Sequence, residues 1–431
     1  MAKKRLSVGV LGLGYVGLPL AIAFARAGAR VVGFDLDLRK VKAVNAGRSY
    51  IRHIPAAEVR SITAAGGFAS ADPSALAEPD AVLICVPTPL TPNRVPDLRH
   101  VEEAADLTAE TLRPGQLICL ESTTYPGTTR EVLLPRLERG GLKAGRDFFL
   151  AYSPEREDPG NSERSASRIP KVVGGLTPRC LAVAEKVYSL AVPATVPVSS
   201  LETAEAAKLM ENIFRCVNIA LVNELKQVLA RLGIDIWEVV KAASTKPFGY
   251  MPFYPGPGLG GHCIPIDPFY LAWKARGHDC ATRFIELAGE VNLAMPEYVA
   301  ARAAEELNRE RKSLNGSSLL LIGLAYKKNV DDVRESPSLR LLEIFSERGA
   351  RVSYHDPLVP RMPPGHFTGA LSRLASRSLR PETLRKQDAV IVATDHDAVD
   401  FAWVGRHARL VVDTRNAMSG LGKTRARVVK A

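Results

Sequence analysis

Short apolar runs alternate with amphipathic stretches in the first 200 residues. A helical pattern over Tyr15–Ala27 separates the first two runs. Continuous apolar strands of this length, separated by helices, are typical of a parallel sheet covered on both faces. We therefore predict a doubly wound α/β domain over residues 1–198, whose strands are Leu6–Leu11, Arg30–Phe34, Ala81–Val86, Gln116–Leu120, Phe148–Tyr152 and Lys171–Gly174.

Helical periodicity replaces this alternation from Thr203 onward. One long helix is predicted to end at Gly233, with an apolar stripe of Leu209, Ile213, Val217, Ala220 and Leu221. More helical sequence follows, interrupted by FYPGPGLGGHCIPIDP. We expect an all-helical region over residues 199–312. A helix of this length favours packing at a subunit interface, so we expect a homodimer or a higher homo-oligomer.

Three strings of the last domain repeat strings of the first in the same order. GARVSYHDP (349–357) matches GARVVGFDL (28–36), DAVIVATDHD (388–397) matches DAVLICVPTP (80–89), and RLVVDTRN (409–416) matches QLICLESTT (116–124). The expected fold class is therefore α/β, with two doubly wound, Rossmann-like domains at 1–198 and 313–431 joined by the helical region.

A glycine fingerprint lies between the first strand and the first helix. Gly12 permits a tight turn, Gly14 lets a pyrophosphate approach the backbone, and Gly17 lets the helix pack on the strand. Asp35 ends the second strand, where a carboxylate can bind a ribose 2′-hydroxyl and would repel a 2′-phosphate. The pattern predicts NAD rather than NADP; the alternative is a plain turn with a surface aspartate.

The segment from Gly256 to Asp267 carries the most specific chemistry. Cys263 lies in a glycine-rich loop rather than among aliphatic residues, next to His262 and four residues before Asp267. A thiolate can attack an aldehyde, and a carboxylate can take a proton directly or through water. The alternatives are an unreactive loop thiol or a metal ligand, but no Cys/His cluster supports a metal site.

Other candidate groups are weaker when taken alone. Lys208 and Asn212 share a helix face and could donate to a developing oxyanion, or simply form a solvated face. The segments Val86–Pro89 and Ser122–Thr124 follow strands and could bind a ribose or serve as turns. Glu155 in SPERE could be a base or a turn residue. The basic string LLLIGLAYKKN (319–329), with Arg415 after a later strand, suits a bound nucleotide.

The net charge of +11 favours anionic partners. Because the basic residues are spread along the chain, we expect a small phosphorylated ligand rather than nucleic acid. The six cysteines include no CxxC pair, so a reducing compartment is expected, with Cys85 and Cys119 as core thiols. Glycines and Pro19 interrupt the first apolar stretch, so we expect neither a signal peptide nor a membrane partner, and a cytoplasmic location.

Taken together, the chain resembles the UDP-glucose/GDP-mannose dehydrogenase family over nearly its whole length. The strings that carry the resemblance are GLGYVGLP, ESTTYPGTT, YSPERE, AEAAKLMENIFR, GPGLGGHCIPIDP, GLAYKKNVDDVRESPS and VVDTRN. The resemblance implies an NAD-binding domain at 1–198, a helical dimerisation domain at 199–312 and a UDP-sugar-binding domain at 313–431. It also implies a role in polysaccharide biosynthesis.

The same resemblance assigns roles to individual residues. It implies oxidation of the sugar C6 alcohol in two steps, with Asp267 as base through a water, Lys208 and Asn212 steadying the oxygen, and Cys263 as covalent catalyst. Thr123 and Glu155 would orient the hydrolytic water. NAD contacts would come from Gly12, Gly14, Tyr15, Val16, Gly17, Asp35, Lys40, Thr88, Thr124 and Arg334. Substrate contacts would come from Glu155, Lys208, Asn212, Gly260, Tyr326, Lys327 and Arg415.

Two departures from the UDP-glucose enzymes shift the expected sugar. Ile266 replaces a lysine before Asp267, and TKPFGYMPFY offers no arginine upstream of the cysteine. Both favour a UDP-N-acetylhexosamine, with UDP-GlcNAc first and UDP-glucose or UDP-GalNAc as alternatives. A two-electron hydroxyacid dehydrogenase or a non-catalytic nucleotide sensor would not require Cys263, Asp267 and Lys208 together.

Overall fold

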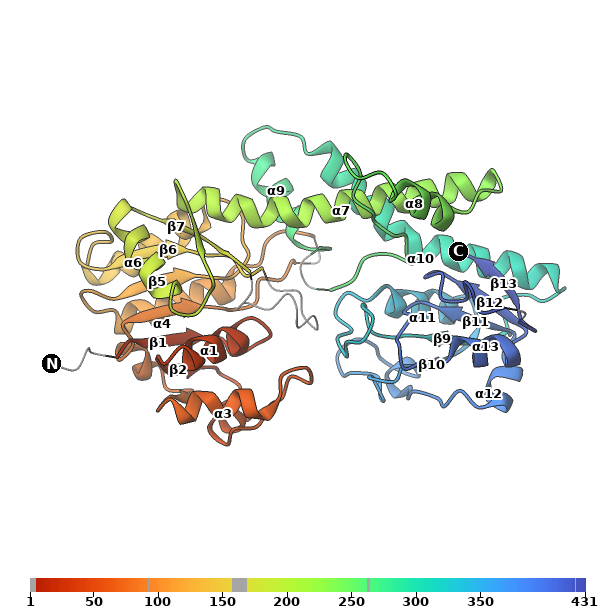
Figure 1. Cartoon of the computed structure of the whole chain (residues 1–431), viewed down its shortest axis with the longest axis horizontal. Coiled ribbons are helices and arrows are strands. Elements are labelled where there is room, and N and C mark those ends of the chain that lie inside the picture. The colour runs from red at the N-terminus through yellow and green to blue at the C-terminus, as the bar shows by residue number, and fades with distance from the viewer. Residues whose placement is uncertain (1–4, 92, 157–168, 262–263, 423) are drawn as a thin grey trace. The chain divides into compact units, whose positions relative to one another are not determined.

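The computed structural model describes residues 5–91, 93–156, 169–261, 264–422 and 424–431. These residues form two compact units, which are shown in Figure 1. Unit 1 comprises residues 1–212 and 269–281, and unit 2 comprises residues 213–268 and 282–431. The division into three domains at 198 and 312 stays a prediction.

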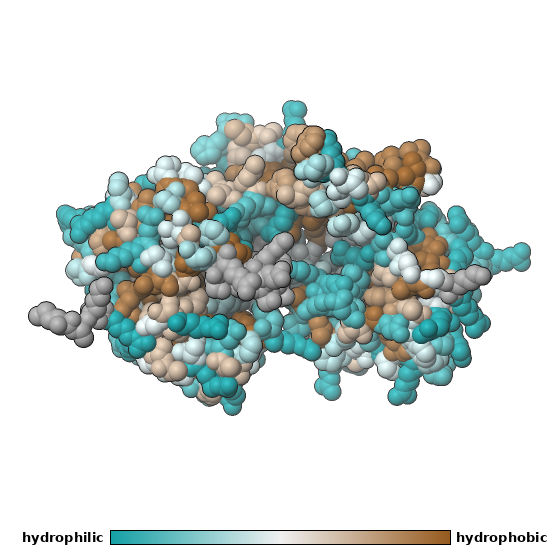
Figure 2. Space-filling view, in the orientation of Figure 1, coloured by the Kyte–Doolittle hydropathy of each residue, from teal (hydrophilic) through white to brown (hydrophobic). Residues whose placement is uncertain are grey.

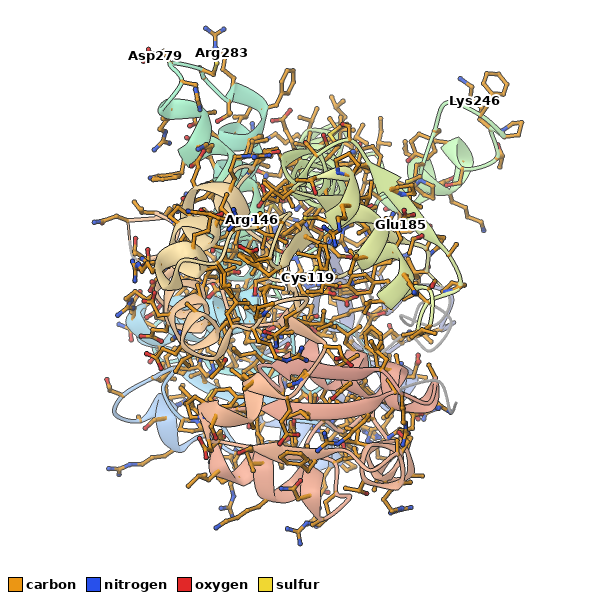
Figure 3. All side chains as sticks on the ribbon, turned by 90° about the vertical axis from the view of Figure 1, so that its left-hand side faces the viewer. Cys119, Arg146, Glu185, Lys246, Asp279 and Arg283 are labelled. Atoms are coloured by element: carbon orange, nitrogen blue, oxygen red, sulfur yellow. The ribbon has the colours of Figure 1, made fainter. Side chains whose placement is uncertain are left out.

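Unit 1 is built on an eight-stranded sheet in the order β3-β2-β1-β4-β5-β6-β7-β8. The strands are β1 (Ser7–Leu11), β2 (Arg30–Phe34), β3 (Phe68–Ser70), β4 (Ala81–Ile84), β5 (Leu117–Leu120), β6 (Phe149–Tyr152), β7 (Lys171–Gly175) and β8 (Thr195–Val198). The helices of this unit are α1 (Gly17–Arg26), α2 (Leu38–Asn45), α3 (Ala56–Ala64), α4 (Arg99–Thr111), α5 (Leu134–Leu137) and α6 (Pro178–Tyr188). Cys85 and Cys119 are buried in its core, as predicted, and Figure 3 labels Cys119.

Two strands of this sheet, β7 and β8, run opposite to the others, against the prediction of a parallel sheet, because β8 pairs parallel with β7. β7 pairs antiparallel with β6, with Ala151 opposite Gly175 and Tyr152 opposite Gly174. An apolar run signals that a strand is buried but carries no information about its direction. Direction is set by the connection, and a parallel partner needs a crossover that usually contains a helix.

Unit 2 contains a five-stranded parallel sheet in the order β10-β9-β11-β12-β13. The strands are β9 (Ser318–Ile322), β10 (Arg351–His355), β11 (Ala389–Val392), β12 (Leu410–Asp413) and β13 (Arg427–Lys430), with helices α11 (Pro337–Glu347), α12 (Pro381–Arg385) and α13 (Phe401–His407). The order β10-β9-β11-β12 reproduces β2-β1-β4-β5 of unit 1. The predicted repeat, and with it the predicted fold class, is confirmed.

The helical region contains α7 (Leu201–Arg231), α8 (Ile236–Ala243), α9 (Asp267–Arg276) and α10 (Arg283–Arg309). The apolar stripe predicted for the long helix α7 is buried only in part. Leu209 and Ala220 are buried and Ile213 and Val217 are half-buried, but Leu221 is 51% exposed. The polar residues Asn212, Asn223 and Lys226 are buried as well, so the interior face of α7 is mixed. Part of its apolar surface, including Leu221, lies uncovered in the single chain. None of the helices in the described ranges is long and apolar enough to cross a bilayer.

Candidate active site

The three fingerprint glycines meet different constraints at the end of β1. Gly12 has a φ of +95°, and a Cβ there would lie 2.4 Å from the carbonyl oxygen of Cys85. A Cβ at Gly17 would lie 1.8 Å from the Gly12 oxygen. A Cβ at Gly14 would meet nothing within 4 Å, and its φ is not positive. The fold thus requires glycine at positions 12 and 17, whereas at Gly14 the open space fits an approaching pyrophosphate.

Asp35 follows β2 and faces the same turn. Its carboxylate accepts hydrogen bonds from the backbone N–H of Leu13 at 2.8 Å and of Asp37 at 2.9 Å, and pairs with Lys40 at 2.9 Å. Tyr50 closes the turn from another side by donating to the Leu13 carbonyl at 2.6 Å. This arrangement can hold an adenosine ribose beside the carboxylate, with Lys40 free to move on its flexible stem.

Tyr15 and Val16 belong to the turn itself. The Tyr15 ring stacks on His53 with centroids 6.3 Å apart, and Val16 is the N-cap residue of α1 without a side-chain capping bond. The N-terminus of α1 therefore presents backbone N–H groups and the positive end of its dipole, which suit a bound phosphate. The predicted NAD contacts of unit 1 gather at one edge of the sheet.

The strand order reverses between β1 and β4, and β5 is the next strand along the sheet. Thr88 is buried after β4, and its carbonyl accepts a hydrogen bond from Tyr270 of α9 at 2.6 Å. After β5, Thr123 is half-buried and Thr124 is fully buried. The Thr124 hydroxyl has no hydrogen-bond partner among the described residues. A buried hydroxyl without a partner at a topological switch point indicates a place for a ligand atom.

Glu205 anchors the start of α7 to the segment that follows β5. Its carboxylate accepts hydrogen bonds from Gly127 N at 2.6 Å, Thr129 N at 2.9 Å and Thr129 Oγ1 at 2.7 Å. Burial raises the pKa of Glu205 to about 7, although these hydrogen bonds oppose the shift. Lys208 follows three residues later, so it lies on the same helix face as Glu205.

A second contact fixes α7 to the end of β6. Arg156, next to Glu155, pairs with Glu211 at 2.6 Å. Lys208 lies between the two anchors and Asn212 directly follows the second, and both residues are buried. The structure thus brings Lys208, Asn212 and Glu155 to the carboxyl edge of the sheet that carries the glycine fingerprint. An ammonium and an amide there can donate to an oxyanion.

Glu155 is backed by a buried charged cluster. The Lys171 ammonium lies 2.7 Å from Glu121 and 3.9 Å from Glu155. Tyr188 donates to Glu121, and burial alone would lower the pKa of Lys171, but the Glu121 and Glu155 carboxylates raise it. Lys171 therefore stays charged and holds two carboxylates, one of which is the candidate water-activating group.

The glycine-rich loop of unit 2 packs tightly up to Gly261. A Cβ at Gly260 would lie 2.5 Å from the Cβ of Tyr326, and Gly261 N donates to the carbonyl of Arg334 at 2.9 Å. Cys263, the predicted covalent catalyst, and His262 lie outside the described residues. Asp267, the predicted base, is buried and is the first residue of α9.

The segment after β9 carries Tyr326, Lys327 and Arg334. Asp356 holds its beginning by accepting from Leu324 N at 2.7 Å and Ala325 N at 3.0 Å. His396 lies 3.2 Å from Asp356 through Nε2, and its Nδ1 accepts from Asn329 N at 3.0 Å. Burial alone would raise the pKa of Asp356, but His396 and the backbone N–H groups lower it to about 2. The clamp keeps Lys327 on a fixed backbone.

Arg334 and Arg415 occupy different surroundings in unit 2. The Arg334 guanidinium pairs with Asp332 at 2.6 Å, so its predicted NAD contact stays a prediction. Arg415 Nε donates to the Ala393 carbonyl at 2.9 Å, and its guanidinium abuts Gly256, where a Cβ would lie 2.6 Å from Nη1. Arg415 thus lies beside the glycine-rich loop, where a cation can bind a diphosphate.

Sequence reasoning missed several residues that build this site: Glu121, Lys171, Tyr188 and Glu205. Only Glu205 carried a usable signal, because it precedes Lys208 by three residues and therefore shares its helix face. The others come from segments far apart in the chain and meet only in the folded protein.

An eight-stranded sheet with this strand order, a glycine fingerprint and an acidic residue after the second strand defines an NAD-dependent dehydrogenase. Sequence profiles of the UDP-glucose/GDP-mannose dehydrogenase family match three segments: the NAD binding domain at residues 6–192, the central domain at 202–294 and the UDP binding domain at 320–420. The chain belongs to this family of NAD-dependent nucleotide-sugar dehydrogenases.

Individual relatives differ in the sugar that their names give. The chain is 37% identical over 359 residues to the UDP-N-acetyl-D-glucosamine 6-dehydrogenase of Pseudomonas aeruginosa, covering 83% of this chain and 84% of that one. It superposes on a UDP-N-acetylmannosamine dehydrogenase of Pyrococcus horikoshii with a TM-score of 0.88, 32% identity and 99% coverage of both chains. It also superposes on a UDP-glucose dehydrogenase of Pyrobaculum islandicum with a TM-score of 0.86 and 30% sequence identity, covering 100% of this chain and 98% of that one.

Proposed function

We propose that this protein oxidises the C6 hydroxyl of a UDP-N-acetylhexosamine to the uronate in a four-electron reaction. UDP-GlcNAc is the first candidate for the substrate. One observation carries the proposal. Two anchors, Glu205 and Glu211, fix the part of α7 that carries the buried residue Lys208 at the sheet edge that bears the NAD fingerprint. This placement supports an oxyanion-stabilising cation beside the nicotinamide end of the cofactor site.

NAD, when bound at the glycine fingerprint, accepts a hydride from C6 in each of the two oxidations. In the first oxidation, Asp267 takes the proton of the C6 hydroxyl through a water, while Lys208 and Asn212 donate to the developing oxyanion. The C6 aldehyde then forms a C–S bond with the Cys263 thiolate, which gives a thiohemiacetal.

Loss of the second hydride converts the thiohemiacetal to a thioester. Water then attacks the carbonyl carbon, the C–S bond breaks, and the carboxylate leaves with the thiol restored. Thr123 and Glu155 orient and activate this water, and the Lys171 ammonium lies 3.9 Å from the Glu155 carboxylate. One water and two NAD are consumed for each sugar.

The N-acetylhexosamine assignment rests on the relative named for UDP-GlcNAc and on two departures, Ile266 and the absence of arginine in TKPFGYMPFY. A panel of UDP-GlcNAc, UDP-ManNAc, UDP-GalNAc and UDP-glucose tests it through the yield of NADH. We expect two NADH per sugar and the highest kcat/KM with UDP-GlcNAc. One NADH per sugar would point instead to a two-electron dehydrogenase, and ligand binding without NADH to a sensor.

Lys208 gives a second test of the mechanism. Lys208→Met removes the oxyanion donor, and we expect kcat to fall about a hundredfold to a thousandfold, with a smaller change in substrate binding. The exposed Lys241 on α8 offers the matched control Lys241→Met. Equal kcat in wild type and Lys208→Met would remove Lys208 from the chemistry.

We further propose a homodimer formed through the exposed apolar face of α7. Phe214, Leu221, Leu225, Val228 and Leu232 recur at spacings of seven, four, three and four residues and are 38–66% exposed. Figure 2 shows apolar surface over the C-terminal end of α7 and α8. Sedimentation should give a dimer, and Leu225→Glu should give a monomer. A cytoplasmic location is proposed as well, supported by free thiols at all five described cysteines.

A further inference from the structure

Lys226 is a buried lysine on α7 that the proposed chemistry does not use. It lies eighteen residues after Lys208 in the sequence. Lys226 is 5% exposed and belongs to unit 2.

The contacts of Lys226 converge on the first glycine of the catalytic loop. Its ammonium donates to the Gly256 carbonyl at 3.3 Å. Asn223, one turn earlier on α7, accepts from Gly256 N at 2.9 Å, and its own amide donates to Asn292 of α10 at 3.0 Å. Both polar groups of the Gly256 backbone are therefore held by side chains of one helix.

The missing side chain of Gly256 faces Arg415. A Cβ at this position would lie 2.6 Å from Arg415 Nη1, so the guanidinium packs directly on the glycine backbone. Two cations, Lys226 and Arg415, thus flank one residue inside the protein. Such a pair is unfavourable on its own and is stabilised when an anion binds next to it.

We propose that Lys226 is a positioning residue that, together with Asn223, holds Gly256 against Arg415. In this position the backbone of the glycine-rich loop and the Arg415 guanidinium form one surface, which binds the diphosphate of the substrate. The inference rests on the proposed function, because it takes a nucleoside diphosphate as the ligand of Arg415.

Electrostatics agree with this placement. Burial and the Arg415 charge lower the pKa of Lys226 to about 7, opposed by Asp413. The other charged or titratable groups that line the adjoining cavity are Asp235, Tyr298, Arg302, Glu306, Arg309 and Lys430. Binding of a diphosphate offsets the Arg415 charge, which raises the pKa of Lys226 and draws a proton onto it. The cavity, of about 380 Å³, gives that proton a route from solvent.

The test is calorimetry of UDP binding at pH 7.5 in two buffers of different ionisation enthalpy. We expect the wild type to take up roughly 0.5 to 0.7 proton more per UDP than Lys226→Met, which cannot be protonated. Lys241→Met, which removes an exposed lysine of the same unit, should match the wild type. UDP binding with equal proton uptake in wild type and Lys226→Met overturns the inference.

Kinetics separate a positioning role from a merely structural one. Lys226→Met should raise KM for the UDP-sugar about tenfold and leave KM for NAD and kcat within about threefold. Lys226→Arg, which keeps a charged donor, should show a smaller rise in KM than Lys226→Met. An unchanged KM in Lys226→Met overturns the inference, as does a fall confined to kcat. Absence of UDP binding by the wild type would instead overturn the proposed function itself.

Discussion

Asp35 and Asp356 occupy equivalent positions in the two sheets, and each accepts a hydrogen bond from the residue after a positive-φ glycine. The donors are Leu13 N at 2.8 Å and Leu324 N at 2.7 Å. Asp356, however, also binds the backbone N–H groups of Ala325, Leu358 and Val359 and the ring of His396. Its oxygens are saturated, so the carboxylate that can bind a ribose in unit 1 serves as a clamp in unit 2.

The open space at Gly14 gives the first prediction. Gly14→Ala should leave the free energy of unfolding within about 0.5 kcal/mol, since the added Cβ meets nothing within 4 Å. The same methyl obstructs the pyrophosphate, and we expect NAD binding to weaken about tenfold to a hundredfold. Urea unfolding and NAD titration measure the two effects. Unchanged NAD affinity would show that the cofactor does not approach this backbone.

Gly12→Ala is the contrasting variant. Its Cβ would lie 2.4 Å from the Cys85 carbonyl at a φ of +95°, so the protein should lose about 2 kcal/mol or more of stability. A stable Gly12→Ala protein would contradict the turn geometry described here.

Glu205 should give the protein a pH-dependent stability between about pH 4.5 and pH 7. Its folded-state pKa of about 7 exceeds the ordinary value of 4.5, so the folded state binds the proton more tightly than the unfolded state. The contribution of Glu205 is therefore fully present below pH 4.5 and is lost as the pH rises through 7, by roughly 3 kcal/mol.

Urea unfolding of Glu205→Gln across this window measures the effect. The pH dependence due to this residue should vanish in the variant. Glu202→Gln is the control, because pairing with Arg130 lowers the pKa of Glu202 and places its effect at lower pH. A wild-type stability that rises from pH 5 to pH 7, with the same slope in Glu205→Gln, would contradict the prediction.

The buried Lys171–Glu121 pair should be costly to break from one side. Lys171→Met leaves Glu121 as a buried carboxylate without its cation, and we expect a loss of about 3–5 kcal/mol. Glu121→Gln in the Lys171→Met background should recover part of that loss. Urea unfolding of both single variants and the double variant measures the coupling, and strictly additive losses would argue against a coupled pair.

Cys263 gives a prediction of stoichiometry. Cys263→Ser should stop after the first oxidation or hold a dead-end adduct, because an alkoxide forms less readily than a thiolate at neutral pH. NADH formed in a single burst should not exceed one per site, without uronate. Full turnover to the uronate by this variant would remove the covalent step from the mechanism.

The repeated strings and the apolar runs predicted both sheets, because buried parallel strands leave a continuous apolar signal in the sequence. The short or more exposed strands β3, β8 and β13 were not predicted. The direction of β7 could not be read in this way. The buried face of α7 was predicted only in part. Leu209 and Ala220 of the predicted apolar stripe are buried, but periodicity cannot tell an internal position from one that lies uncovered on the single chain, as Leu221 does.

The candidate site was predictable where a residue belongs to a local pattern, as for Gly12 and Gly14. The Lys171 cluster and the Lys226–Gly256–Arg415 contact depend on residues between 16 and 189 positions apart along the chain. Such contacts are set by tertiary packing alone. The roles of Thr123, Asp267 and Cys263 stay predictions.

The unpartnered hydroxyl of Thr124 has a consequence for selectivity among cofactor and substrate analogues. Leaving it without a hydrogen bond destabilises the empty protein by about 1–3 kcal/mol. A molecule that offers an acceptor or donor at this point regains that free energy, whereas an otherwise identical molecule lacking the atom does not. The protein should therefore bind analogues with different affinity when they differ by a single polar atom near the Thr124 hydroxyl. Changes in the size of other groups should affect the affinity less.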